Sequence, residues 1–302
     1  MLPYRRIHLT HRLNYEDRST CKPGGKKLHL GQLKLLMSEI LFLAKTAKGG
    51  ETVIYVGAAE GYHIYKLAEM FPNIKFELWD GRDFDIDPHP NIQKNKSLFT
   101  NNHAQQYAKR QEKGEKFLFI SDIRNMEFGR VKKIKDKGEK LEADKKIIGG
   151  DMRMQMEWCQ IINPEWAYLK FRLPYAQGVS DYLSGKIYLQ PYSPKSTETR
   201  LLTQDYDTLV EYDNLENDGL MAYFNCNIRF DPLDDHRWNK VMDNYGIKPI
   251  WDNYIAFYIL AYYLEKINNK PPEDKEVAEL FNVCINFHRK KYGDRYDYLY
   301  TD

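Results

Sequence analysis

The stretch Thr52–His63, TVIYVGAAEGYH, decides the fold of this chain. Four apolar or aromatic residues run into a loop with glycines at positions 57 and 61, and a helical run, HIYKLAEMF, follows at once. A strand, a glycine turn and a helix in this order present backbone N–H groups to a ligand in a parallel α/β sheet. The run from Ile74, IKFELWDGR, predicts a neighbouring strand, and its acid, Asp80, is placed to bind a ribose diol.

The glycine loop narrows the choice of ligand. A dinucleotide-binding loop has the pattern G-x-G-x-x-G, whose middle glycine makes room for a pyrophosphate. Here the loop reads Gly57-Ala58-Ala59-Glu60-Gly61, which lacks that glycine and places an anion beside the turn. A carboxylate there is a poor neighbour for two phosphates but a tolerable one for a cationic sulfonium. The loop therefore favours S-adenosylmethionine over NAD, and a nicotinamide oxidoreductase is an alternative that rests on Asp80 alone.

The composition predicts a folded chain with an uneven charge. Of its 302 residues, 42% are apolar or aromatic, which is ample for a core, and 23 tyrosines can both pack and stack. The net charge is +2, but residues 1–48 hold ten Lys and Arg against three acids, and residues 205–218 hold six acids and no base. A basic first segment is typical of a polyanion-binding protein, and a solvated surface arm is the competing interpretation.

The four cysteines and eight histidines show no ligand spacing. Their separation disfavours a zinc site or a disulfide framework and favours a reducing compartment, so we expect no metal. No apolar run reaches membrane-spanning length, and the beginning, MLPYRRIHLTHR, has no apolar region of a signal peptide. We expect an intracellular, soluble protein without a membrane partner.

The order of the elements predicts an α/β protein with a doubly wound, mostly parallel sheet and helices on both faces. Residues 1–29 are expected to form a basic N-terminal arm, and residues 30–302 a single domain. Residues 130–146, with eight bases and four acids, are expected to form a mobile surface loop. Further helices are expected at 31–48, 104–110, 150–162, 215–225, 252–267 and 275–289, and further strands near 98–100, 116–121, 166–174, 186–189 and 200–203.

Four charged residues stand at or near the ends of expected elements. Asp122 follows the buried strand KFLFIS, Lys170 lies in the apolar strand WAYLKFRLP, and Glu198 precedes the strand at 200–203. Lys34 lies on the polar face of the first helix. Each has an ordinary interpretation as well. Asp122 would be a helix N-cap, Lys170 would extend its ammonium group to solvent at the rim of the sheet, and Lys34 would be a solvated surface lysine.

Around a nucleoside pocket, two lysines and two acids form a sensible site for methylating an alcohol. A sugar hydroxyl is a very weak acid, so it needs a base or a strong polarising field as the methyl group arrives. A lysine amine acts as a base near neutral pH only where burial or a second cation lowers its pKa. Acids beside the lysine would orient its amine and balance its charge.

Six stretches carry a resemblance to a known family: GQLKLLMSEILFLAK, VIYVGAAEGYHIYKL, WDGRDFD, FLFISDIR, IINPEWAYLKFRLPY and QPYSPKSTETRLLT. In this order and at this spacing, over roughly residues 14–204, the chain resembles the cap-specific mRNA 2′-O-methyltransferases of poxviruses. A relative from another large DNA virus fits equally well. The resemblance implies a Rossmann-like class I methyltransferase fold and S-adenosylmethionine as cofactor, with S-adenosylhomocysteine as product and no metal. It also implies N7-methylguanosine-capped mRNA as substrate and a location in the host cytoplasm or the virion.

The resemblance assigns the family's catalytic tetrad to Lys34, Asp122, Lys170 and Glu198. It makes Lys170 the principal base or polarising group for the 2′-hydroxyl of the first transcribed nucleotide. Asp122 would hold the Lys170 amine, while Lys34 and Glu198 would tune the field. The cofactor-binding residues that it implies are Gln32, Tyr55, Gly57, Gly61, Asp80, Arg82, His103 and Asp122.

For the cap, the resemblance implies a cation–π sandwich of the 7-methylguanine between Tyr15 and Tyr175. An acid would read the guanine edge, and Glu216 is the nearest candidate. The residues that it implies in contact with the cap or the RNA backbone are Arg172, Ser196 and Thr197.

Two residues depart from the family's pattern. Glu60 replaces a proline that is usual in the glycine loop, which could alter the affinity for the cofactor. Gln177 stands where the family has an aspartate in the cap pocket, so guanine-edge recognition could differ, and Asp181 could substitute for that aspartate.

Two hypotheses follow from the resemblance. In the first, the protein methylates the first-nucleotide 2′-hydroxyl of capped mRNA, converting cap 0 to cap 1. In the second, it is an RNA-binding processivity subunit of a viral poly(A) polymerase, with a catalytic polymerase subunit as partner and methylation secondary or lost.

Overall fold

The computed structural model of the protein describes residues 30–124, 131, 133–175, 177–229 and 236–301. The expected N-terminal arm, residues 1–29, lies outside the described residues, and so does Tyr15. The described chain divides into two compact units. One, the sheet unit, comprises residues 47–189 and 197–219, and the other, the helical unit, comprises residues 30–46, 190–196 and 220–301. The single domain expected over residues 30–302 stays a prediction.

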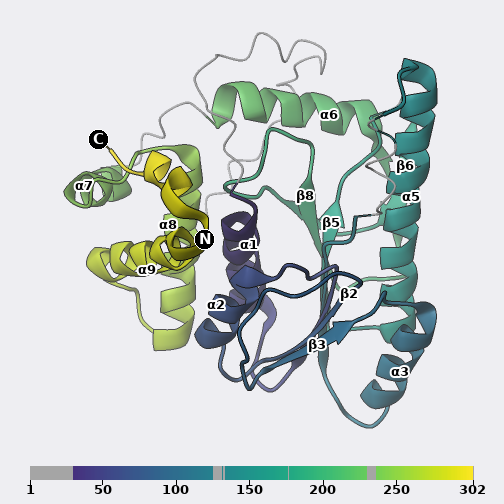
Figure 1. The fold of residues 1–302 in the computed structure, drawn as a ribbon, viewed down its shortest axis with the longest axis horizontal. Coiled ribbons are helices and arrows are strands. Elements are labelled where there is room, and N and C mark those ends of the chain that lie inside the picture. Colours follow the sequence, from purple (N-terminus) through teal and green to yellow (C-terminus); the bar gives the residue numbers. More distant parts are fainter. Residues whose placement is uncertain (1–29, 125–130, 132, 176, 230–235, 302) are drawn as a thin grey trace. The chain divides into compact units, whose positions relative to one another are not determined.

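The sheet unit is built on a seven-stranded sheet with the order β3-β2-β1-β4-β5-β8-β7 (Figure 1). Strands β1 to β5 are parallel, β8 is antiparallel to β5, and β7 is antiparallel to β8. This arrangement confirms the predicted doubly wound, mostly parallel α/β fold. The strands are β1 (Thr52–Val56), β2 (Lys75–Asp80), β3 (Ile92–Lys96), β4 (Phe117–Ser121), β5 (Trp166–Phe171), β7 (Lys186–Tyr188) and β8 (Thr199–Thr203).

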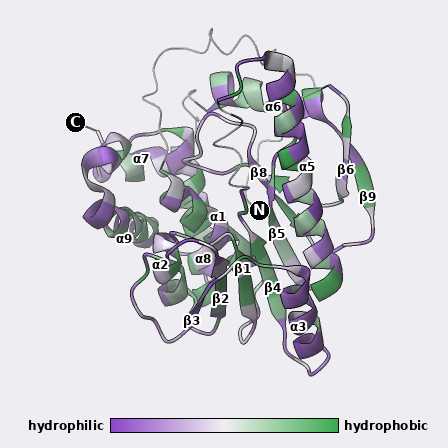
Figure 2. Cartoon of the chain, turned by 45° about the vertical axis from the view of Figure 1, so that its right-hand side comes forward, coloured by the Kyte–Doolittle hydropathy of each residue, from purple (hydrophilic) through white to green (hydrophobic). Residues whose placement is uncertain are grey.

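The apolar content of each strand follows its place in the sheet. The central strands β1 and β4 are buried at every position, as expected for strands covered on both faces. At the edge, β3 reads IQKNK and is largely exposed. Figure 2 shows this contrast as hydrophobic colouring of the middle strands and hydrophilic colouring of β3.

Helices cover both faces of this sheet. Helices α3 (Asn101–Gln111) and α5 (Lys137–Ile162) pack against each other on one face, and α2 (Tyr62–Met70) lies on the opposite side (Figure 1). The core under α3 and α5 contains Phe99, Trp158 and Phe171. A second, two-stranded sheet pairs β6 (Val179–Leu183) with β9 (Leu209–Asp213), and α6 (Asn214–Tyr223) follows it.

The register of the parallel strands brings three loops to one level. Val56, the last residue of β1, is paired with Trp79 on one side and with Ser121 on the other. The chain therefore leaves β1, β2 and β4 at neighbouring points of the same edge. Strand order reverses between β1 and β4, and ligands of open α/β sheets bind at such a switch point.

The helical unit contains α1 (Gly31–Thr46), α7 (His236–Asn244), α8 (Trp251–Asn268) and α9 (Asp274–Tyr292). A π-helical segment, Phe224–Ile228, and a 3-10 helix, Gly293–Leu299, complete it. Helix α1 packs against α8 and α9. A buried ion pair joins Arg229 to Asp252, whose carboxylate also accepts from the backbone N–H of Tyr192 at 2.8 Å. This network ties the 190–196 segment to α8.

Several expectations about elements were wrong. The basic run was expected to be a loop, but from Lys137 onward it is the first part of α5, because Asp136 caps the helix by accepting from the Glu139 N–H at 2.8 Å. The third strand lies at Ile92–Lys96, ahead of the range 98–100 predicted for it. Strands β6 and β9 were not predicted at all.

The cysteines of the described residues are in two states. Cys159 and Cys284 are free and buried, whereas Cys226 is disulfide-bonded. The spacing of the cysteines disfavoured disulfide bonds, and the disulfide at Cys226 contradicts that expectation. Cysteines that are far apart in the sequence can lie close together in the fold.

Candidate active site

The loop after β1 lies against the chain that leaves β4. Gly57 has φ +80°, and a Cβ on it would lie 2.8 Å from the carbonyl carbon of Asp122 and from the nitrogen of Ile123. The Gly57 N–H donates to the carbonyl of Trp79, the residue before Asp80, at 2.8 Å. Glycine is therefore required at position 57 both by its backbone conformation and by the close approach of a neighbouring backbone.

The second glycine of the loop is confined in the same way. Gly61 has φ +76°, and a Cβ there would lie 2.7 Å from Cδ1 of Ile86 and 2.8 Å from the carbonyl oxygen of Ala58. Between the glycines, the peptide bond from Ala59 to Glu60 is cis. The backbone of the loop thus follows one closely packed path from β1 into α2.

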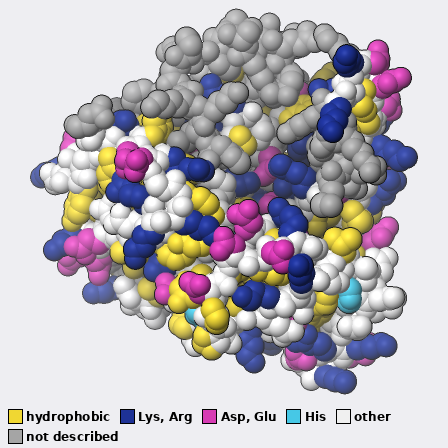
Figure 3. Space-filling model, viewed as in Figure 1, with side chains coloured by type: hydrophobic (Ala, Val, Ile, Leu, Met, Phe, Trp, Pro, Cys, Tyr) yellow, Lys and Arg dark blue, Asp and Glu magenta, His cyan; other side chains and the backbone are white. Residues whose placement is uncertain are grey.

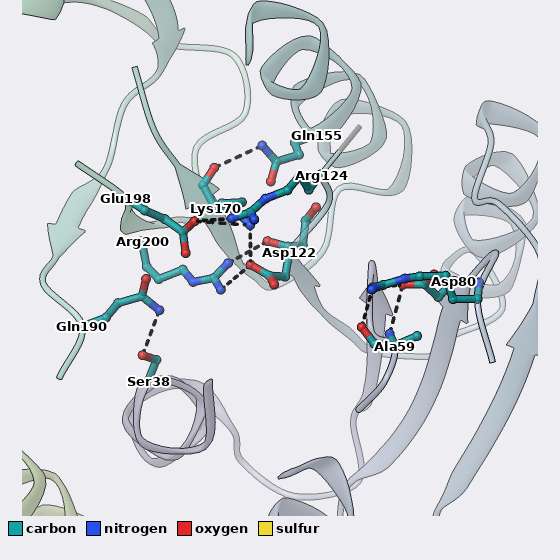
Figure 4. Close-up of polar contacts among 12 residues, drawn as sticks. Ser38, Ala59, Asp80, Asp122, Arg124, Gln155, Lys170, Gln190, Glu198 and Arg200 are labelled. Carbon is teal, nitrogen blue, oxygen red and sulfur yellow. Dashed lines mark hydrogen bonds and ion pairs between the residues drawn. The ribbon is translucent and has the colours of Figure 1, made fainter. Parts of the chain in front are cut away.

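Asp80 at the end of β2 is joined to this loop. Its Oδ2 accepts from the Ala59 N–H at 3.0 Å, and its Oδ1 accepts from the Arg82 N–H at 2.9 Å and from the Arg82 guanidinium. Burial raises the pKa of Asp80, but the hydrogen bonds from Arg82 and Ala59 outweigh burial and hold that pKa below its ordinary value. An ionised carboxylate therefore stands beside the glycine loop (Figure 4).

Three of the four predicted catalytic residues are in contact at the same edge of the sheet. The Nζ of Lys170 lies 3.1 Å from Oδ1 of Asp122 and 3.4 Å from Oε2 of Glu198 (Figure 4). Their side chains are between 5% and 17% exposed, so the ion pairs are shielded from solvent. Lys170 comes from β5, Asp122 directly follows β4, and Glu198 directly precedes β8. Their catalytic role stays a prediction.

Two arginines extend this cluster, and neither was named as a site residue in the sequence. Arg200 of β8 is 1% exposed and donates to Oδ1 of Asp122 at 2.6 Å and to the carbonyl of Ser121 at 3.0 Å. Burial lowers the pKa of Arg200, but the carboxylates of Asp122 and Glu198 outweigh burial and raise it, so the guanidinium stays charged. Arg124 donates to Glu198 at 3.3 Å.

A sequence signal for Arg200 existed. Lys170 was singled out because a cation inside an apolar strand is unusual, and Arg200 within TRLLT has the same property. The two residues face each other in the antiparallel pairing of β5 and β8. Arg200 could therefore have been found by the argument that found Lys170.

Lys34 and Gln32 belong to α1 of the helical unit. Lys34 is only 6% exposed, which contradicts its interpretation as an ordinary solvated lysine. Its carbonyl accepts from the Ser38 hydroxyl at 2.7 Å, and Gln190 donates to the same hydroxyl at 3.0 Å (Figure 4). The face of α1 that carries Lys34 and Ser38 is therefore buried.

The remaining predicted cofactor residues of the sheet unit, Tyr55 and His103, pack against neighbouring aromatic side chains. Tyr55 in β1 is fully buried, with its ring edge-on to His63 of α2 at 6.2 Å. His103 caps α3 by accepting from the Thr100 N–H at 3.1 Å, and its ring lies 4.4 Å from the ring of Trp79 in β2. His103 is thus placed next to the strand that ends in Asp80.

The predicted cap residues of the sheet unit fall into two places. In the first, the Arg172 guanidinium lies 4.7 Å from the ring centre of Tyr175, and Asp144 of α5 accepts from Arg172 at 3.3 Å. Burial raises the pKa of Asp144. One face of the Tyr175 ring is therefore already packed against a planar cation, the guanidinium of Arg172.

In the second place, the β6–β9 pairing brings the segments of Gln177 and Glu216 together. Asn214 donates its backbone N–H to Gly178 at 3.0 Å, and Val179 is paired with Asp213. Gln177 and Asp181 are exposed, and Glu216 is half-buried at the start of α6. The acids considered for the guanine edge therefore come from neighbouring segments.

The other two predicted RNA-contact residues adjoin Glu198. Thr197 is buried, and the Ser196 carbonyl, in the helical unit, accepts from Asn225 at 3.0 Å. Over the described residues, no group of three or more His, Cys, Asp or Glu side chains is arranged to hold a metal ion. None of the described helices combines the length and the apolar character that crossing a membrane requires.

Comparisons with known proteins identify the family of the chain. The family model described as "Poly A polymerase regulatory subunit" matches residues 3–285. The chain is 29% identical over 238 residues to the cap-specific mRNA (nucleoside-2′-O-)-methyltransferase of myxoma virus (strain Lausanne), covering 72% of this chain and 67% of that protein. It is 31% identical over 222 residues to the protein of the same name in fowlpox virus (strain NVSL), covering 66% of this chain and 68% of that protein. The chain therefore belongs to the poly(A) polymerase regulatory subunit family.

Proposed function

We propose that this protein transfers a methyl group from S-adenosylmethionine to the 2′-hydroxyl of the first transcribed nucleotide of a capped mRNA. The observation that carries the proposal is the Lys170 Nζ, held between the carboxylates of Asp122 and Glu198 at the switch point of the sheet. The names of the myxoma and fowlpox relatives support this activity. Because these relatives are viral, we place the protein in the host cytoplasm during infection, which fractionation of infected cells would test.

The residues around the glycine loop fit the cofactor. Asp80 is ionised and offers two acceptor oxygens, which suits a ribose diol, while Arg82 and the Ala59 N–H fix its orientation. Glu60 and Asp122 add negative charge near the loop, which suits a sulfonium and not a pyrophosphate. When bound, S-adenosylmethionine would supply an electrophilic methyl group.

Lys170 would orient and polarise the acceptor hydroxyl. An ammonium group has three N–H donors. One of them donates to Oδ1 of Asp122 at 3.1 Å, and the ion pair with Glu198 at 3.4 Å restrains the amine as well. With the amine held in this way, a further donor would meet an acceptor oxygen at a set position. Arg200 donates to the same oxygen of Asp122, Oδ1, and so restrains the carboxylate that Lys170 contacts.

Methyl transfer to short capped RNAs tests the activity. Wild-type protein should methylate an N7-methylguanosine-capped RNA at its first 2′-hydroxyl, and Lys170→Met should lower the rate by about 10²- to 10⁴-fold. The matched control is Lys116→Met, because Lys116 also pairs with a carboxylate, that of Glu165, but is 61% exposed. Normal turnover by Lys170→Met, or an equal loss in Lys116→Met, would refute the assigned role.

Binding of the cofactor is tested separately from turnover. Asp80→Asn keeps the shape of the side chain but removes its charge, so its affinity for S-adenosylhomocysteine in calorimetry should fall by about 10-fold, while Lys170→Met binds as wild type. Tight binding of NAD and none of S-adenosylhomocysteine would instead support the oxidoreductase alternative.

The description of the matching family favours a second function, as the processivity subunit of a poly(A) polymerase. Exposed lysines on the first turns of α5, Lys140, Lys145 and Lys146, offer contacts for RNA phosphates. In the view of Figure 3, basic side chains stand among acidic ones on the side where α5 lies. Because acidic side chains stand among the basic ones, RNA would contact only a small part of this surface.

A processivity assay with the cognate polymerase catalytic subunit tests this second function. Lysine-to-glutamine changes at those three positions should shorten the poly(A) tails made per binding event and leave methyl transfer unchanged. Asp122→Ala should lower methyl transfer and leave the length of the poly(A) tails unchanged. Absence of any complex with the polymerase would remove this second function and leave the first intact.

A further inference from the structure

The β5 strand extends one step beyond its parallel neighbour at Lys170. The ladder between β4 and β5 ends with Ser121 paired to Leu169, because the chain leaves β4 at Asp122. On the other side, the ladder with β8 continues through Lys170 to Phe171. The backbone at Lys170 therefore has a strand on one side only.

A side chain takes the place of the missing strand. Nε2 of Gln155, on α5, donates to the carbonyl oxygen of Lys170 at 3.1 Å (Figure 4). The same nitrogen lies 3.5 Å from the hydroxyl of Tyr182. Gln155 is 1% exposed, so its amide is removed from water and the bond acts in a low-dielectric surrounding.

Apart from Asp151, the buried residues of α5 around Gln155 are apolar, so a buried amide there is costly unless it is hydrogen-bonded. Ile148, Met152 and Trp158 of α5 belong to the core that also contains Leu169 and Phe171 of β5. A methionine or leucine at 155 would extend that core, whereas a glutamine must be hydrogen-bonded to be tolerated. The described partners of the amide are the Lys170 carbonyl and the Tyr182 hydroxyl.

The side chain of Gln155 lines a small, mostly apolar pocket beside Lys170. Oε1 of Gln155 is buried and has no hydrogen-bond partner among the described residues. A pocket of about 20 Å³, lined by Lys170, Arg172 and Asp151 as well as Gln155, adjoins it. This volume accommodates one water molecule, whose hydrogen bonds would satisfy Oε1.

We propose that Gln155 is a positioning residue that fixes the backbone of Lys170, and thereby its Nζ, for the methyl transfer proposed above. Leu169 and Phe171 point into the core under α5, so the alternating side chain of Lys170 points to the other face of the sheet. Gln155 thus holds the strand from the face opposite to the lysine side chain. A tilt of the strand end would move Nζ away from Asp122 and Glu198, and displacements of about 1 Å can cost about 10²-fold in rate.

Two variants of Gln155 and one control test this role, with wild-type methyl transfer to capped RNA measured first. Gln155→Met keeps the length and apolar volume of the side chain but has no donor. Gln155→Glu keeps its shape, and its ionised form, which is favoured at high pH, cannot donate to the Lys170 carbonyl. The control, Gln160→Met, removes a bond of the same chemical kind from an exposed position of the same helix, since Gln160 donates to the Tyr206 carbonyl at 3.0 Å.

Both Gln155 variants should lower kcat by about 10- to 100-fold with the affinity for S-adenosylhomocysteine and the KM for RNA unchanged. In Gln155→Glu, kcat relative to wild type should rise as the pH is lowered, because a protonated carboxyl donates again. A purely structural residue would lower the folded fraction without changing kcat per folded molecule or its pH profile.

Wild-type kcat in a folded Gln155 variant, or the same loss in Gln160→Met, overturns the role of Gln155. Should the methionine variant fail to fold, the isosteric glutamate variant decides. If wild-type protein does not methylate capped RNA, the proposed function fails, and that result is distinct from an active wild type with equally active Gln155 variants.

Discussion

Arg200 binds Asp122 from inside the sheet, with 2.6 Å between Nη2 and Oδ1. The same carboxylate oxygen accepts from Lys170 at 3.1 Å, so one oxygen of Asp122 is shared by a fully buried guanidinium and by the lysine head. The second nitrogen of the Arg200 fork reaches the carbonyl of Ser121, the residue before Asp122. Asp122 is therefore fixed at both its backbone and its side chain before any substrate arrives.

Loss of Arg200 should weaken both the fold and the catalytic cluster. Arg200→Met leaves Asp122 partly buried with one fewer cation, and breaking a buried ion pair from one side costs about 3 kcal/mol in the free energy of unfolding. Arg200→Lys keeps the charge but cannot span Ser121 and Asp122 together, so it should be more stable than Arg200→Met and still slow in methyl transfer. Urea unfolding and single-turnover rates measure the two effects, and a fully active Arg200→Lys would show that the fork is dispensable.

Gly57 is the position where one added carbon atom should disturb the site. Gly57→Ala imposes a left-handed backbone on an alanine and places its Cβ 2.8 Å from the backbone of Asp122. The matched control is Gly114→Ala, since Gly114 has φ +93° and open space around the added Cβ. Both variants carry the conformational strain, so the excess loss in Gly57→Ala, about 2 kcal/mol, isolates the close approach. Equal unfolding free energies for the two would mean that the loop and β4 separate freely.

The parts of the fold that sequence could predict are those with a strong local pattern. TVIYV and FLFIS are apolar runs of strand length that are rich in β-branched or aromatic residues, and this combination favours strands. The edge strand IQKNK has no such pattern, because only pairing with β2 makes it a strand. Strands β6 and β9 likewise depend on each other and leave Val179, Leu209 and Val210 exposed.

The parts of the site that sequence could predict are side chains with unusual chemistry for their place. A lysine in an apolar strand and an acid after a buried strand drew attention to Lys170 and Asp122, and the structure places them in contact. Gln155 had no such signal, because its partner is a backbone carbonyl and every residue has one. Its role follows only from the fact that β5 is longer than β4.

Acid should weaken the attachment of β2 to α3. Glu77 of β2 accepts two bonds from Arg110, at 2.8 and 2.9 Å, and one from Tyr107 at 2.6 Å. Burial raises the pKa of Glu77, but the bonds from Arg110 and Tyr107 outweigh burial and lower it below its ordinary value. Because the folded pKa lies below the unfolded one, the stabilisation is complete above the unfolded pKa, about 4.3, and is lost as the pH falls through the folded pKa.

Glu77→Gln tests this pH dependence. At pH 7 the variant should lose about 2 kcal/mol of unfolding free energy, and the difference from wild type should shrink as the pH falls below about 4. Glu115→Gln is the control, because Glu115 also binds Arg110 but is exposed at the surface. Urea unfolding at several pH values measures both variants. A difference for Glu77→Gln that is the same at pH 7 and pH 3 would contradict the ionised state assigned to Glu77.

Tyr175 should set the preference for an N7-methylated cap. Its ring packs against the Arg172 guanidinium at 4.7 Å, so the ring already makes a cation–π contact with a planar cation, and 7-methylguanine is another planar cation. Tyr175→Ala should reduce the ratio of kcat/KM between methylated and unmethylated capped RNA by about 10-fold, while Tyr175→Phe, which keeps the ring, retains that ratio. Tyr15→Ala should reduce it similarly if Tyr15 supplies the second ring predicted from the sequence. Matched kinetics on the two RNAs measure the ratio, and a Tyr175→Ala variant that discriminates as well as wild type would exclude this ring from cap recognition.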